Sequence, residues 1–283
     1  MTVTCATLAA ILATATPGST ITLAKGSDCS NVRITRDMPR QTTINLGGST
    51  LRGTTITGSG WRLRSGTLRA TGGAHASGPA GYGLKIAGQR IRIDGVLVTD
   101  AKKGVVVDQA ATVTIADSRF LRLGEDGIIA SRVRGFQVLR NRFAEVIGKP
   151  TECQTAGGVL PGLSRRDCEA RGGVWKDGYH ADAVQMRNGV TNALIESNEV
   201  NYAGQGLTQM DTTGDAPLES VVIRGNRVRA DGHHITLGNC LGCSIIGNDV
   251  GRYGSASFKA VIRAGTSRRC GNVAQDEKPD GAC

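Results

Sequence analysis

A short strand-like pattern that recurs along most of the chain constrains the fold more than any other feature. Most copies open with a small residue and then alternate inward and outward positions, which is the period of a β-strand. Seven copies occur, at residues 83–86, 104–107, 127–130, 183–186, 206–209, 234–237 and 260–263. One such strand cannot bury its apolar side alone, so the repeat predicts strands that stack on one another.

A second signature follows the middle copies, with apolar residues on both sides of an asparagine or serine. The polar residue falls at Ser118, Asn141, Asn198, Asn226 and Asn248, so successive copies are 23, 57, 28 and 22 residues apart. A period of roughly 20–30 residues with two or three strands per unit is typical of a solenoid. Asparagines recurring at one corner are expected to form a ladder of amide hydrogen bonds. An antiparallel sandwich with chance spacing is the alternative.

The predicted architecture is an all-β, single-stranded parallel β-helix of roughly ten coils, one domain over residues 1–283. Residues 4–15, with Leu8, Ile11 and Leu12 on one face, are predicted to form a short helix within an N-terminal cap, residues 1–17. The gap of 57 contains an insertion, residues 149–177, that carries Cys153 and Cys168. Residues 266–283 are expected to form a C-terminal tail.

Composition agrees with a strand-rich chain and constrains its partner. Forty glycines against four phenylalanines and two tryptophans disfavour a helical bundle. The formal net charge of +10 suits an acidic partner, which can be nucleic acid, an anionic membrane or an acidic polysaccharide. The arginines are scattered over turns without a basic helix, and no apolar run is long enough to cross a membrane. We therefore expect an acidic polysaccharide, and neither nucleic acid nor a membrane.

Eight cysteines, an even number, indicate an oxidising compartment. Zinc is disfavoured because a single pair of cysteines has a ligand-like gap. Residues 1–15 lack the basic start and apolar core of a signal peptide, so we expect any such peptide to have been removed and the protein to be secreted or periplasmic. Order along the chain suggests local pairs among about 105 possible connectivities: Cys5–Cys29, Cys153–Cys168, Cys240–Cys243 and Cys270–Cys283.

The capping helix ended by Pro17-Gly18, the coils and the asparagine corner together resemble the pectate-lyase-like superfamily of right-handed parallel β-helices. The resemblance covers most of the chain and implies the right-handed fold. It leaves the activity open, because the superfamily includes polysaccharide lyases, glycoside hydrolases, uronan epimerases and phage tailspikes. The segment from His180 through Asp182 to Gln185 is similar to a His-x-Asp-x-x-Gln segment of some bacterial β-helix proteins that act on glycans.

Aligning the strands on their opening residue places the outward residues in columns along the solenoid. Gln185 belongs to a second column and Arg187 to a third. Asp182 then has Asp126 on one side and His233 two coils beyond, as on the floor of a long groove that suits an extended polymer. The column just before the opening residue contains Tyr82, Lys103, Asp126, Asp182, Gln205, His233 and Lys259.

Elimination from a uronate requires a base and a group that neutralises the sugar carboxylate. The candidate catalytic residues are His180, Asp182 and His233. Neutralisation is expected from Gln185, Arg187 or a calcium ion shared by Asp126 and Asp182. Lys103 and Lys259 complete the expected substrate-binding set. Each also has a purely structural interpretation, as a turn residue or a solvated surface charge.

Three other functions stay open on these residues. Asp126 and Asp182 on neighbouring coils can meet the carboxyl spacing of a glycoside hydrolase. The chain lacks the Asn-Thr-Asp, Asp-Asp, Gly-His-Gly and Arg-x-Lys motifs of pectin-type hydrolases, which favours elimination. A uronan epimerase would use the same residues as a lyase. A non-catalytic glycan-binding shaft is the third alternative, although shafts usually trimerise and a monomer is expected here.

Overall fold

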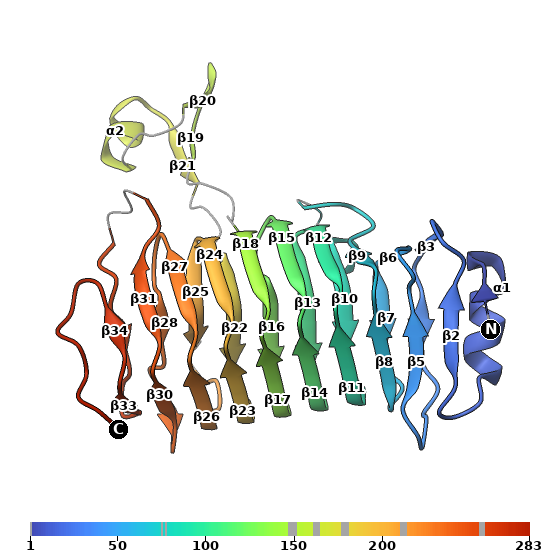
Figure 1. Cartoon of the computed structure of the whole chain (residues 1–283). Coiled ribbons are helices and arrows are strands. Elements are labelled where there is room, and N and C mark those ends of the chain that lie inside the picture. The colour runs from blue at the N-terminus through green and yellow to red at the C-terminus, as the bar shows by residue number, and fades with distance from the viewer. Residues whose placement is uncertain are drawn as a thin grey trace.

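The chain folds as a stack of coils in which three parallel sheets form the walls (Figure 1). The computed structural model describes residues 2–74, 76, 78–146, 152–160, 165–176, 181–209, 214–254 and 258–283. Each coil contributes one strand to each wall, and neighbouring coils pair in parallel register. A right-handed parallel β-helix is therefore the fold, as the sequence predicted.

The walls are named here by their strands. Sheet A contains β1 (Thr2–Val3), β2 (Thr20–Leu23), β5 (Thr42–Asn45), β8 (Trp61–Arg64), β11 (Gln89–Asp94), β14 (Ala111–Ala116), β17 (Arg134–Leu139), β23 (Thr191–Glu196), β26 (Leu218–Arg224), β29 (Cys240–Leu241), β30 (Ser244–Ile246) and β33 (Arg268–Cys270). Sheet B contains β3 (Asp28–Ser30), β6 (Thr50–Arg52), β9 (Thr67–Arg69), β12 (Leu97–Ala101), β15 (Arg119–Leu123), β18 (Arg142–Val146), β24 (Glu199–Ala203), β27 (Arg227–Ala230), β31 (Asp249–Arg252) and β34 (Val273–Ala274). Sheet C contains β4 (Arg33–Ile34), β7 (Thr54–Ile56), β10 (Tyr82–Ile86), β13 (Lys103–Asp108), β16 (Ile128–Ser131), β22 (Asp182–Arg187), β25 (Gln205–Gln209), β28 (Ile235–Thr236) and β32 (Ile262–Arg263).

Period-2 alternation fills the interior of the coils. In β13, Val105 and Val107 are fully buried, whereas Val106 between them faces outward. Burying such a side chain contributes about 1.5–3 kcal/mol. The small residue that opens most strands of sheet C has a steric cause. A Cβ on Gly104 or on Gly127 would lie 2.5 Å from a carbonyl oxygen of the next coil, so the corner excludes a side chain.

The asparagine corner lies between sheets A and B and forms the expected ladder. The side-chain oxygen of each asparagine accepts the backbone N–H of the preceding rung, as in the 2.9 Å bond from Asn141 N to Asn198 Oδ1. The amide nitrogen of Asn198 donates to the Val138 carbonyl at 2.8 Å. The ladder continues one coil further than predicted, because Asn248 N donates to Asn272 Oδ1 at 2.9 Å.

The N-terminal end is capped by helix α1 (Cys5–Thr14), which the sequence placed at 4–15. Leu8 and Leu12 are buried against the first coil, and Thr4 and Thr7 form a capping box. Strand β1, which no sequence pattern predicted, precedes the helix and pairs with β2. A disulfide between Cys5 and Cys29 ties the helix to sheet B.

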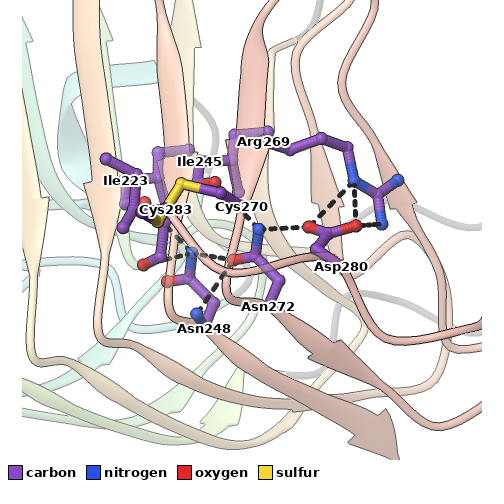
Figure 2. Close-up of a disulfide and its surroundings, with 9 residues drawn as sticks. Ile223, Ile245, Asn248, Arg269, Cys270, Asn272, Asp280 and Cys283 are labelled. Atoms are coloured by element: carbon purple, nitrogen blue, oxygen red, sulfur yellow. Dashed lines mark hydrogen bonds and ion pairs between the residues drawn. A yellow bond between two sulfur atoms is a disulfide. The ribbon is translucent and has the colours of Figure 1, made fainter.

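Two further predicted disulfides are present, Cys240–Cys243 and Cys270–Cys283. The second of them closes the C-terminal end of the stack. Figure 2 shows that Asn272, the last ladder rung, donates to Asp280, which also pairs with Arg269. Strands β33 and β34 pair within the stack, so coils extend into the segment expected as a tail, 266–283. Cys168 is also disulfide-bonded. The side chain of Cys153 lies outside the described residues, so the Cys153–Cys168 pair stays a prediction.

The insertion contains a small antiparallel sheet and one helix: β19 (Glu152–Thr155), β20 (Gly158–Leu160), β21 (Val174–Lys176) and α2 (Arg165–Ala170). It leaves the stack after β18 and returns before β22, and Figure 1 shows it apart from the coils, above them. A single turn of 3₁₀ helix, Gly78–Gly81, precedes β10. None of the helices in the described ranges has the length and apolar character required to cross a bilayer.

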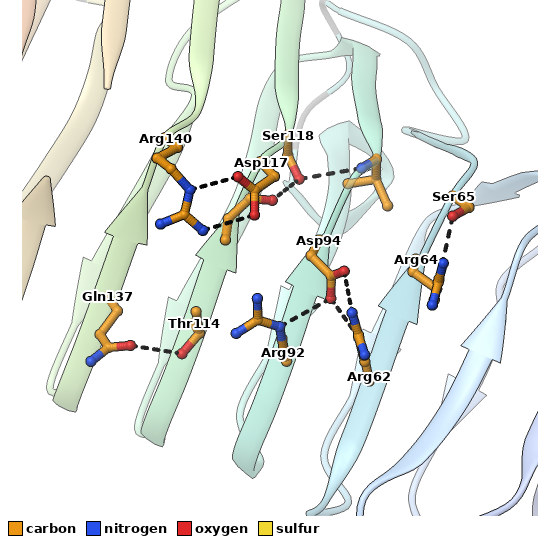
Figure 3. A network of polar contacts seen from close by, with 12 residues as sticks. Arg62, Arg64, Ser65, Arg92, Asp94, Thr114, Asp117, Ser118, Gln137 and Arg140 are labelled. Carbon is orange, nitrogen blue, oxygen red and sulfur yellow. Dashed lines mark hydrogen bonds and ion pairs between the residues drawn. The ribbon is translucent and has the colours of Figure 1, made fainter. Parts of the chain in front are cut away.

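Ion pairs between coils cover the outer face of sheet A. Figure 3 shows Asp94 of β11 between Arg62 of β8 and Arg92 of its own strand, at 2.6 and 3.2 Å. One coil further, Asp117 pairs with Arg140 at 2.8 Å. These pairs lie at the surface, where each contributes less than about 1 kcal/mol.

Candidate functional site

Two aspartates meet where sheet B turns into sheet C. Asp126 precedes β16, and Asp182 is the first residue of β22, the neighbouring strand. Register pairs Ile128 with Val184, which sets the two aspartates side by side. The backbone N–H of Asp182 donates to Asp126 Oδ1 at 3.0 Å. The predicted juxtaposition of these residues is therefore present.

The two aspartates are buried, whereas the sequence pattern predicted that they lie on an open groove floor. Asp126 is 2% exposed and Asp182 is not exposed at all. Gln185 Nε2 donates to Asp182 Oδ2 at 3.0 Å, and the Thr208 hydroxyl donates to Asp182 Oδ1. Two donors on one carboxylate favour its ionised form. Gln185 and Thr208 are neighbours in the outward column of sheet C, so Asp182 lies directly beneath that face.

Asp126 has a different electrostatic environment. Burial, followed by the Asp182 carboxyl, raises the pKa of Asp126 well above its ordinary value of 3.8. The Asp182 N–H and the Lys103 charge oppose this rise without cancelling it. Asp126 is thus suited to keep a proton while Asp182 is ionised. Such a division between two neighbouring carboxyl groups is a frequent property of acid–base sites.

A trough lies along the outer face of sheet C, made of two adjoining depressions of about 240 and 220 Å³ that share Tyr82 and Lys85. It extends from β4 to β22, and Arg187 lines its C-terminal part. Lys103 lines the same part and pairs with Glu125, the residue before Asp126, at 3.3 Å. The trough therefore reaches the neighbourhood of the aspartate pair.

Cations along the trough differ in whether a carboxylate neutralises them. Lys103 is paired with Glu125, and Arg132 with Asp108 at 2.7 Å. Within the described part of the chain, no carboxylate forms an ion pair with Lys85 or Arg187. Unpaired cations on a long open face are suited to an anionic polymer.

The two predicted residues near the C-terminal end lie apart from the aspartates. Asp182 is aligned with Gln205, and Gln205 is aligned with His233, so His233 lies two coils beyond Asp182. Arg263 Nη1 lies 2.7 Å from His233 Nδ1. Because arginine can only donate, this ring nitrogen is the acceptor, which suits binding better than proton abstraction. Ile235 pairs with Ile262, so Ala260 rather than Lys259 is aligned with His233, and the exposed Lys259 lies one residue outside the predicted column.

His180 lies outside the described residues, so its predicted catalytic role is untested. A calcium ion does not fit the donors at hand. Ca²⁺ takes about six to eight oxygen ligands. No cluster of three metal-ligating side chains is found in the described ranges, and one oxygen of Asp126 and both oxygens of Asp182 already accept hydrogen bonds. We assign no chemical step to a cation.

Three residues of this site were missed as functional residues. Thr208 stood in the same column as Gln185, which was a usable signal, since a hydroxyl beside an amide predicts shared hydrogen bonds. Lys85 stood in the same column as well and was visible in the same way. Glu125 gave no signal, because its pairing with Lys103 depends on the turn before β16.

Comparison with known proteins supports the fold. No family model matches the chain, and no curated protein matches its sequence. The crystal structure of the Dettilon tailspike protein is similar with a TM-score of 0.58 and 13% identity, over 95% of this chain and 56% of that one. The crystal structure of pectate lyase Pel9A is similar with a TM-score of 0.56 and 13% identity, over 95% of this chain and 72% of that one.

The chain thus spans little more than half the length of the tailspike. Together with the three parallel sheets, these similarities identify the fold as a right-handed parallel β-helix. At 13% identity they extend to the fold alone.

Proposed function

We propose that this protein degrades an acidic, uronate-containing polysaccharide that binds along the trough of sheet C, and that cleavage occurs by β-elimination. The observation that carries the proposal is the buried Asp126–Asp182 pair beside unpaired cations on the same face. Ordinary surface packing would not need two buried carboxyl groups side by side. Burying them costs stability, and such costs are typical of functional sites.

Elimination assigns each group one task. Arg187 neutralises the uronate carboxylate, which acidifies the adjacent C–H. The proton moves from this carbon to the Asp182 carboxylate or to His180, and the C4–O bond breaks as the double bond forms. Asp126 supplies the proton that the departing oxygen takes. Gln185 and Thr208 hold Asp182 in place through its two oxygens.

Hydrolysis is the second candidate, and one observation favours it. A carboxyl group with a raised pKa beside an ionised one is also the arrangement of a glycoside hydrolase. In that reaction Asp126 would protonate the glycosidic oxygen, and Asp182 would act as nucleophile or base. The same two residues serve both reactions, so products must distinguish them.

The test is incubation with a panel of uronate polymers, each with and without chelator. β-Elimination gives an unsaturated product that absorbs in the ultraviolet, and we expect this signal to grow with new chain ends. New reducing ends without the absorbance would replace elimination by hydrolysis. Binding without any new ends would show a glycan-binding shaft and overturn both.

The disulfides are consistent with this function. Three are formed among the described residues, as is typical of an oxidising compartment. A polysaccharide too large to enter a cell is encountered in such a compartment. We therefore propose that the protein acts as a secreted or periplasmic monomer.

A further inference from the structure

Aromatic side chains are scarce in this chain, and three of them are partly exposed and make ring contacts: Tyr202 with Tyr253, and Phe258 with His233. The chain has four phenylalanines, four tyrosines and two tryptophans. Trp61, Phe120, Phe136 and Phe143 are fully buried in the coils. By contrast, Tyr253 is 38% and Phe258 54% exposed, and both lie after β31, near the turn from sheet B into sheet C. We call Tyr202, Tyr253 and Phe258 the aromatic corner.

Tyr202 and Tyr253 form a stacked pair. Their ring centroids are 4.3 Å apart, with 22° between the planes. Tyr202 is the second-last residue of β24 and has a left-handed φ of 68°. The matching residues of the three preceding coils are Asp100, Arg122 and Glu145, which also have left-handed φ values. Charged residues at this position face solvent, so a tyrosine there adds nothing to the core and needs another explanation.

A cation lies beside the aromatic corner. The rings of Phe258 and His233 are 6.2 Å apart, and Arg263 donates to His233 at 2.7 Å. Arg263 is exposed, and it forms no ion pair with a carboxylate in the described part of the chain. It also belongs to the outward column that starts from Gln185 and runs through Thr208 and Thr236. Arg263 therefore continues the face that holds the aspartate pair on its C-terminal side, and His233 joins it to Phe258 of the aromatic corner.

The chemistry of these groups fits one kind of ligand. A sugar ring presents an apolar C–H face that packs on an aromatic ring, and its polar edge stays accessible to hydrogen bonds. A guanidinium matches a carboxylate in geometry and charge. Resting on the proposed function, we infer that the aromatic corner is a second subsite. It binds a uronate residue of the same polymer, with its ring on Tyr253 or Phe258 and its carboxylate on Arg263.

The subsite is tested by binding rather than turnover, in the Asp126→Asn background, so that substrate is not consumed. Tyr253→Ala, Phe258→Ala and Arg263→Gln are compared with Leu241→Ala, which removes an exposed apolar side chain of sheet A, 55% exposed, away from the corner. The probes are uronate oligosaccharides of increasing length and their carboxyl-reduced counterparts, measured by calorimetry.

We expect Tyr253→Ala and Phe258→Ala to weaken binding of long oligosaccharides by about tenfold and to leave short ones unchanged. Arg263→Gln should weaken binding of the acidic oligosaccharides and not of the reduced ones. Leu241→Ala should change neither. Equal affinities for all four variants, or equal losses for short and long probes, would overturn the subsite.

The outcome is separable from that of the proposed function. If the wild type binds acidic oligosaccharides in this length-dependent way without cleaving any polymer, the cleavage proposal fails and the subsite stands. If cleavage depends on Asp126 and the corner variants bind normally, the subsite fails and the cleavage proposal stands.

Discussion

The asparagine ladder and the aspartate pair contain the same type of hydrogen bond, but the two have different roles. In the ladder, a buried side-chain oxygen accepts a backbone N–H of the neighbouring coil, at 2.9 Å between Asn141 and Asn198. At the other corner, Asp126 accepts the N–H of Asp182 at 3.0 Å. The ladder side chains are neutral and satisfied on both atoms. The aspartate pair brings at least one charge and one proton into the same kind of buried space.

The comparison separates structural from functional burial. An amide satisfies a coil corner fully, because it donates and accepts. A carboxyl group in its place adds a desolvation penalty and gains only the ability to hold or release a proton. Asp126 is therefore poorly explained by stability alone.

Removing the charge of Asp182 should have the largest effect. Asp182→Asn keeps the shape and removes the base or nucleophile, so turnover should fall at least about 100-fold. Gln185 can still donate to the amide oxygen, and the Thr208 hydroxyl can turn to accept from the amide nitrogen, so the unfolding midpoint should change little. Initial rates on the best uronate polymer, beside a denaturant titration, measure both. A variant that retains most of its turnover would remove Asp182 from the mechanism. His180→Ala is expected to lose a similar factor.

Breaking a ladder rung should affect stability and not chemistry. Asn198→Ala leaves the Asn141 N–H and the Val138 carbonyl without partners, so we expect a loss of about 2–4 kcal/mol in unfolding free energy. Asn198→Asp restores the acceptor but buries a carboxyl group, and it should also destabilise. Urea unfolding gives the free energy, and turnover per folded molecule should stay unchanged. A loss of activity without a loss of stability would contradict a purely structural role for Asn198.

The pH dependence of stability should identify the buried proton. Because the folded pKa of Asp126 is raised, its contribution is complete below the unfolded value near 3.8 and is lost as pH rises through the folded pKa. Relative to the wild type, Asp126→Asn should therefore gain stability as the pH rises. Unfolding free energies of both proteins at a series of pH values test this. Parallel pH curves would show that Asp126 is not protonated in the folded state.

The surface ion pairs should show the opposite sign and the smallest effect. Partial burial raises the pKa of Asp94, but the bonds from Arg62 and Arg92 outweigh it, and the net pKa is lowered. Its stabilisation is present above the ordinary value of 3.8 and is lost as pH falls through the folded pKa. Asp94→Asn should cost less than about 1 kcal/mol at neutral pH, and less still in high salt. A loss that salt leaves unchanged would contradict surface pairing.

Sequence predicted what the strand period controls. Inward residues such as Val105 and Val184 fix the register, so the repeat alone placed Asp126 and Asp182 side by side. The burial of the two aspartates was not predictable, because aligning the strands gives the neighbours of a residue but not the residues that cover it. Register was also lost where the repeat weakens. Lys259 was aligned one residue too early, since Ala260 was taken as the residue that opens the last strand, whereas the register aligns Val261 with His234. The aromatic corner joins residues more than 50 positions apart, and no periodic pattern marks it.

The most direct test of the account is to measure turnover and thermal unfolding of Asp126→Asn at pH 7 in the same preparation. The account predicts a protein that melts no lower than the wild type and has lost at least about 100-fold in turnover. Wild-type turnover, or a lower melting temperature with turnover per folded molecule unchanged, would make Asp126 one more structural rung and contradict the account.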